Sequence, residues 1–180
     1  HETGTRDMRK LSGLFRFMPL TGTLAIIASA SMAGVPLMNG FISKEMFFAE
    51  AVDWHNDSWL DSALPYVATI ASVFAVAYSL RFILTVWFGP PPVELPKEPH
   101  EPVNWMRLPV EILVFVCLVI GLVPGLVLGN ALNAAARSVV GADMAYYSIA
   151  VWHGFNTPLM MSLMALAGGT ILYLLLARTI

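Results

Sequence analysis

Lys44 is the residue of this sequence that is best placed to do chemistry. It follows 27 uncharged residues that begin after Arg16, and Glu45 comes directly after it. A lysine inside a transmembrane segment costs about 3 kcal/mol to insert and marks a functional position by default. Burial disfavours its ammonium form, whereas a neighbouring carboxylate favours that form. A lysine held between these two effects can take up and release a proton.

A second interpretation of Lys44 stays open from its position in the chain. Along a straight helix that starts at Pro19, Lys44 lies about 37 Å from the beginning, beyond a hydrocarbon core of about 30 Å. At that depth a lysine reaches water with its long side chain and serves as an interfacial anchor. An interruption of the helix would instead bring Lys44 into the protein interior.

The apolar run that begins at Pro19 predicts such an interruption. One straight helix over residues 19–52 would be about 51 Å long, which is too long for a single crossing. Gly34 and Pro36 fall inside the run, and Gly40 loosens the turn that follows. Proline removes a backbone donor and clashes with the preceding turn. Discontinuous helices build ion sites in many transporters, while a tilted helix with a proline kink is the simpler alternative.

Two other titratable residues lie in or beside apolar runs. Arg81 comes near the end of the second run and is either a topology anchor or a member of an ion pathway. His153 titrates in a range suited to proton transfer, but it follows Trp152, which favours an anchor at the membrane interface. The sequence contains no His and Cys cluster at metal-ligand spacing, and Cys117 is its single cysteine. We therefore predict no metal and no cofactor.

The sequence has few charged residues, and the long uncharged stretches between them predict the helices that position these side chains. Of 180 residues, 57% are hydrophobic and 12% are charged, against about 25% charged residues in an average soluble domain. Uncharged stretches of 19 and 25 residues follow Asp61 and Glu111, and about 20 apolar residues cross a membrane. The net charge of −2 lacks the basic excess of nucleic-acid-binding proteins.

We therefore predict an all-α, polytopic membrane protein fragment with four transmembrane helices, the first of which is discontinuous. The predicted order is a cytoplasmic flank at 1–18, a broken transmembrane helix at 19–52, a transmembrane helix at 62–88, a cytoplasmic proline-rich loop at 89–108, a transmembrane helix at 109–130, an external loop at 131–156 with room for a short surface helix, and a transmembrane helix at 157–178. This orientation places seven of the ten Lys and Arg residues on the cytoplasmic side and one outside, as the positive-inside rule expects. Because the chain opens on His1, we expect it to continue a larger protein.

Three blocks of the sequence resemble the large A subunit of the Mrp-type multisubunit sodium/proton antiporters. They are HETGTRD at 1–7, MAGVPLMNGFISKE at 32–45 and WHGFNTP at 152–158. That family shares its fold with the proton-pumping membrane subunits of respiratory complex I, which carry a run similar to the second block on a broken helix. The third block favours the Mrp protein over its complex I relatives.

The resemblance implies that Lys44 is the lysine of the family's second discontinuous helix, at the end of a hydrophilic axis that relays protons. Glu45 and Arg81 would join this proton relay. The implied protein is no enzyme but a secondary-active transporter subunit, in the cytoplasmic membrane of a prokaryote. Its partners would be other antiporter subunits, protons, Na⁺ and membrane lipid. The family's first broken helix, with its lysine and glutamate pair, is absent from this chain.

Two other functions remain open alongside cation/proton antiport. One is a proton-pumping membrane subunit of a complex I-like respiratory enzyme, whose activity would follow quinone turnover. The other is a structural membrane segment that packs against other helices and transports nothing.

Overall fold

The computed structural model describes residues 2–53, 59–92, 95–141 and 154–177. Within these ranges all regular structure is helical, which confirms the all-α prediction. The α-helices are α1 (Pro19–Ala33), α2 (Asn39–Asp53), α3 (Trp59–Phe82), α4 (Asn104–Leu122), α5 (Pro124–Val140) and α6 (Thr157–Ala177). A short 3-10 helix, Leu14–Arg16, precedes α1, and a π-helical turn, Ile83–Trp87, continues α3.

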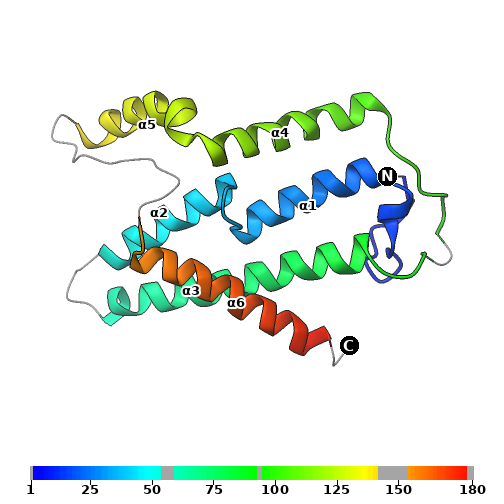
Figure 1. The fold of residues 1–180 in the computed structure, drawn as a ribbon, viewed down its shortest axis with the longest axis horizontal. Coiled ribbons are helices and arrows are strands. Elements are labelled where there is room, and N and C mark those ends of the chain that lie inside the picture. The colour runs from blue at the N-terminus through cyan, green and yellow to red at the C-terminus, as the bar shows by residue number, and fades with distance from the viewer. Residues whose placement is uncertain (1, 54–58, 93–94, 142–153, 178–180) are drawn as a thin grey trace.

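The two halves of the first helix lie in the middle of the bundle. Figure 1 shows α1 and α2 one after the other, between α4 on one side and α3 on the other. Helix α6 crosses α3 and also packs against α2, while α5 contacts α4. Helices α3 and α4 therefore contact both halves of the broken helix, and α6 contacts the second half.

The helices have the length and composition of membrane spans. Trp59–Trp87, Asn104–Leu122 and Thr157–Ala177 are each long and apolar enough to cross a membrane, and Pro19–Ala33 is a shorter apolar helix. Large hydrophobic side chains such as Phe74 and Leu113 are exposed, as is typical of surfaces that face lipid or other transmembrane helices. The chain is thus part of a multi-pass membrane protein, as predicted.

The predicted interruption is present between α1 and α2. Gly34 adopts a left-handed conformation with φ of 82°. Its N–H donates to the carbonyl of Ser31, and the N–H of Val35 donates to the carbonyl of Ala30, both at 3.0 Å. This is the Schellman pattern that ends many helices at a glycine. Pro36 follows and cannot continue the helix, so Gly34 ends α1 and Pro36 prevents its extension.

The structure divides the predicted helix at 109–130 in two, and the second helix continues into the predicted loop at 131–156, where the sequence has room for a short surface helix. Helix α4 ends at Leu122, and α5 occupies residues 124 to 140, so the first part of the predicted loop is helical. Pro124 is the physical reason, because proline restricts the residue before it. Val123 accordingly takes φ of −134° and ψ of 58°. The chain breaks there, well before the predicted end of the helix.

Helices α3 and α4 begin earlier than predicted. Helix α4 begins at Asn104, so that Pro109, the predicted start, lies inside it. Its first turns are supported by an ion pair between Arg107 and Glu111, spaced i,i+4. Helix α3 begins at Trp59 instead of residue 62.

The loop between α3 and α4 holds the beginning of α1. The carboxylate of Glu101 accepts the N–H of Leu20 at 2.6 Å and the hydroxyl of Thr21 at 2.7 Å. A carboxylate at this end satisfies free N–H groups and complements the helix dipole. Close by, Trp87 of the π turn packs in one cluster with Leu14. The start of α1 is therefore fixed in place.

Candidate functional site

Lys44 joins the two halves of the broken helix. It lies on α2, is half-buried, and donates from its Nζ to the carbonyl oxygen of Ala33 at 2.9 Å. Ala33 is the last residue of α1, where unpaired carbonyls give the helix a partial negative charge. This environment favours a cation, and Lys44 supplies it.

Gly34 makes room for the lysine. A Cβ at Gly34 would lie 2.7 Å from Cδ and 3.3 Å from Nζ of Lys44, so the lysine side chain passes directly over this glycine. The left-handed backbone and the close approach both require a residue without a side chain. Gly34 therefore ends α1 and shapes the lysine site.

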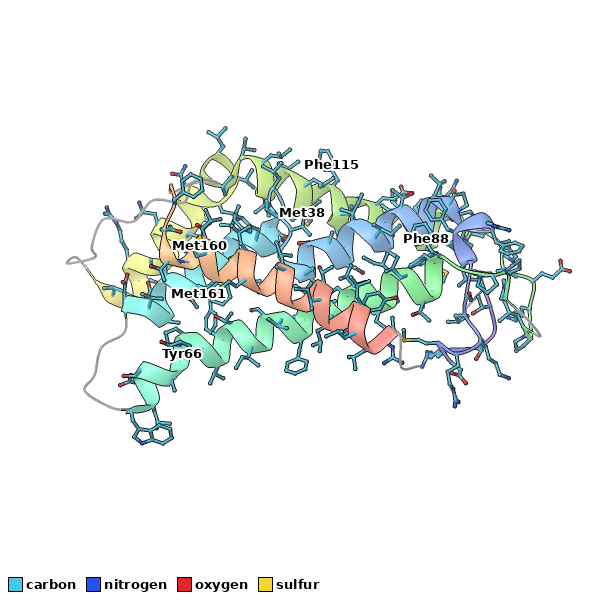
Figure 2. The ribbon with its side chains drawn as sticks, turned by 60° about the horizontal axis from the view of Figure 1, so that its bottom comes forward. Met38, Tyr66, Phe88, Phe115, Met160 and Met161 are labelled. Atoms are coloured by element: carbon cyan, nitrogen blue, oxygen red, sulfur yellow. The ribbon has the colours of Figure 1, made fainter. Side chains whose placement is uncertain are left out.

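Glu45 does not pair with Lys44. Within the described residues no ion pair joins the two side chains, although they are neighbours in sequence. Successive residues of a helix point about 100° apart. Glu45 is 6% exposed and shares the buried face of α2 with Phe41 and Phe48, which cluster with residues of α3 and α6, namely Ala68, Leu159 and Met161. Figure 2 shows Met161 at this end of the bundle.

Arg81 lies away from the lysine, on the outer surface of α3. It is exposed and is spaced by three and seven residues from Tyr78 and Phe74, which are also exposed. Residues at this spacing share one face of a helix. The structure therefore does not bring Arg81 to Lys44. Tyr66 lies near the other end of α3 (Figure 2). It is 73% exposed, which suits an anchor at the membrane interface.

The other two predicted helix-break residues have different roles. Pro36 is exposed in the linker between α1 and α2. Gly40 lies in the first turn of α2, where any Cβ would overlap with the carbonyl oxygen of Ser31 on α1. A Cβ added at Gly121 of α4 would likewise overlap with the carbonyl oxygen of Leu37 in the linker. The absence of two side chains thus lets α2 and α4 approach the backbone at the break.

A group of polar residues at the break was not predicted as a site. Oδ1 of Asn39 accepts from the hydroxyl of Ser31 and from Sγ of Cys117, the latter at 2.9 Å. The hydroxyl of Ser31 accepts the N–H of Gly40 at 3.2 Å. We call Ser31, Asn39, Gly40 and Cys117 the break junction. The one sequence signal for it was an asparagine at the start of a helix, where its side chain often satisfies backbone or nearby donors.

The chemistry that the site can perform is uptake and release of a proton by the amine of Lys44. In the described part of the chain, no three His, Cys, Asp or Glu side chains gather as a metal ion would require. His153 lies outside the described residues. What the arrangement can do is hold an ammonium group at a helix end and release it when the proton is lost.

An all-helical membrane bundle with a lysine at the gap of a broken helix is typical of membrane proteins that move ions. The family described as "NADH:quinone oxidoreductase/Mrp antiporter, TM" matches residues 1–74. The A/B subunit of a probable K⁺/H⁺ antiporter of Rhizobium meliloti is 58% identical over 176 residues, which is 98% of this chain and 18% of that protein. The A subunit of the Na⁺/H⁺ antiporter of Bacillus subtilis is 37% identical over 189 residues, with 99% of this chain and 24% of that protein covered.

A solved structure agrees with these relatives. A chain of the Mrp complex from Dietzia sp. DQ12-45-1b matches with a TM-score of 0.77 and 34% identity, over 97% of this chain and 18% of that one. The chain is therefore homologous to part of the A subunit of the Mrp-type antiporters, and the predicted resemblance is confirmed. It spans about a fifth of the length of the relatives it matches.

Proposed function

We propose that this chain contributes a lysine-based proton-relay site to a monovalent cation/proton antiporter in the cytoplasmic membrane of a prokaryote. The observation that carries the proposal is the hydrogen bond from Lys44 to Ala33 across the gap of a helix in the middle of the bundle. The relatives named above as K⁺/H⁺ and Na⁺/H⁺ antiporter subunits support it. The protein is then no enzyme but part of a transporter, and its partners are other antiporter subunits, protons, Na⁺ or K⁺, and lipid.

In the proposed mechanism Lys44 alternates between two protonation states. As an ammonium group it is held by the carbonyl of Ala33 and by the negative end of α1. After it gives up the proton, the charge that favoured this position is gone. The flexible stem of the lysine then lets the amine turn to the next relay group.

The remaining predicted relay residues act indirectly in this proposal. Glu45 influences Lys44 through its charge from a different face of α2, the one that packs on α3 and α6, since no ion pair joins the two among the described residues. Arg81 faces outward from α3, so it takes part only through groups that lie outside this chain.

The proposal is tested in everted membrane vesicles that contain the full complex. A proton gradient is established, and NaCl or KCl is then added. If the complex is an antiporter, addition of NaCl, of KCl or of each of them releases protons from the vesicles, at a rate independent of quinone turnover. A respiratory proton pump would move protons only during quinone turnover, and a structural segment would leave exchange unchanged when Lys44 is replaced. Either result would exclude the proposed function.

We also propose that residues 1–18, the loop at 89–108 and Arg178 are cytoplasmic, and that 53–61 and 131–156 are external. The distribution of Lys and Arg supports this orientation. In the full-length protein with its other cysteines replaced, single cysteines at Asp57 and Lys97 should react with a membrane-impermeant maleimide from opposite sides. Reaction of both positions from the same side would contradict the orientation.

Gly34→Ala is expected to slow exchange roughly five- to tenfold while the complex still assembles, because the new methyl group displaces Lys44 and costs a hydrogen bond of about 1 kcal/mol. Gly154→Ala is the matched control, since Gly154 has φ of 83° but no atom lies within 4 Å of a Cβ added there. The measurement is the initial exchange rate per assembled complex. Equal rates for both variants would show that backbone conformation, and not contact with the lysine, decides the effect.

A further inference from the structure

The break junction connects three helices through one asparagine side chain. Asn39 is the first residue of α2, Ser31 lies on α1 and Cys117 lies on α4. The carboxamide oxygen of Asn39 accepts from both of the other side chains, and Cys117 is 78 residues away from it in sequence. Helix α4 is therefore hydrogen-bonded to the break itself.

One member of the junction, Ser31, is buried, and the other three are half-buried. Ser31 is 7% exposed, and its hydroxyl also accepts the N–H of Gly40. Away from water, a hydrogen bond is electrostatically stronger, and an unpaired polar group is costly. The hydrogen bonds of Ser31 therefore resist separation of α1 from the start of α2.

The junction also holds both ends of the linker at residues 34–38. Ser31 precedes Ala33 by two residues, and Asn39 precedes Lys44 by five. The linker between them contains Leu37 with φ of 69°, a conformation that a residue other than glycine keeps only when the surrounding structure enforces it. Gly121 of α4 packs on the carbonyl of this same residue. Helix α4 thus supports the linker at two points.

We propose that Asn39 is a positioning residue through which α4 fixes Lys44 at the carbonyl of Ala33. Cys117 is its partner on α4 and supplies one of the two donors. This inference rests on the proposed function of Lys44 as a proton carrier. Without the carboxamide oxygen, the side-chain hydrogen bonds from Ser31 and Cys117 to the start of α2 are lost, so the distance from Nζ to the Ala33 carbonyl is held less firmly.

The first test compares variants in the complete antiporter complex. Asn39→Leu has a similar volume but no acceptor, Cys117→Ala has no donor, and Cys117→Ser keeps a donor. We expect Asn39→Leu and Cys117→Ala to lower the maximal exchange rate per assembled complex about fivefold. The cation concentration for half-maximal exchange should stay unchanged, and Cys117→Ser should restore most of the rate. A Cys117→Ser rate as low as that of Cys117→Ala would overturn the proposal.

The second test measures the thiol itself and does not depend on transport. In a full-length protein whose other cysteines have been replaced, maleimide should modify Cys117 several-fold faster in the Asn39→Leu variant, because the thiol loses its acceptor. An unchanged labelling rate would overturn the proposal. If Lys44→Ala exchanged as fast as the wild type, the proposed function would fail, whereas the labelling result would still show whether the junction exists.

Discussion

Lys44→Ala is expected to lower cation-dependent proton exchange by about 100-fold or more, which is the typical contribution of a positioned proton-transfer group. The complex should still assemble, because alanine also removes the cost of placing a charge in the membrane. The hydrogen bond that is lost joins α1 to α2, but the break junction still connects these helices. The measurement is the rate of proton release on addition of Na⁺ or K⁺ to everted vesicles, normalised to assembled complex.

Lys44→Arg separates a proton carrier from a fixed positive charge. Guanidinium stays protonated across the physiological range and cannot release its proton, so this variant should fail as Lys44→Ala does. Lys97→Ala, at an exposed position in the loop before α4, is the control and should exchange at the wild-type rate. Full exchange by Lys44→Arg at neutral pH would mean that the lysine is a fixed charge or an anchor, and the proton-carrier mechanism would have to be withdrawn.

The interruption before Lys44 was predictable because its causes are local. A glycine that ends a helix and a proline that prevents its continuation act on their own backbone within a few residues. For these reasons α1 ends at Ala33 with Gly34 as its cap, and α2 starts at Asn39. The same reasoning was available at Pro124, but the apolar composition continues across it, and the predicted helix was extended to residue 130.

The surroundings of Lys44 were less predictable because they depend on which way each side chain points and on residues that are far apart in the sequence. Adjacency in sequence predicted that the carboxylate of Glu45 favours the ammonium form of Lys44, but it does not show which way each side chain points, and consecutive residues of a helix face different neighbours. The contact between Asn39 and Cys117 joins residues that are 78 positions apart, and no local pattern identifies such a pair. The carbonyl of Ala33, which accepts the lysine, is a backbone group and leaves no signal in the choice of side chain.

Gly40→Ala is expected to have the largest effect on stability among the glycine substitutions. The added methyl group would overlap with the backbone carbonyl of Ser31, which cannot move aside as the end of a lysine side chain can. Overpacking of a close contact costs about 1–3 kcal/mol or more. Separation of α2 from α1 would also break the hydrogen bond from Gly40 to the hydroxyl of Ser31, so both the break junction and the lysine site should be lost.

We therefore expect Gly40→Ala to lower the melting temperature of the complex and the yield of assembled protein, together with exchange. Gly129→Ala is the matched control, because no atom lies within 4 Å of a Cβ at Gly129, which is inside α5. There alanine favours the helix by about 0.5–1 kcal/mol, so stability should be unchanged or slightly higher. If Gly40→Ala melted and assembled like Gly129→Ala, α1 and α2 would not meet backbone to backbone, and the arrangement that presents Lys44 to Ala33 would need a different support.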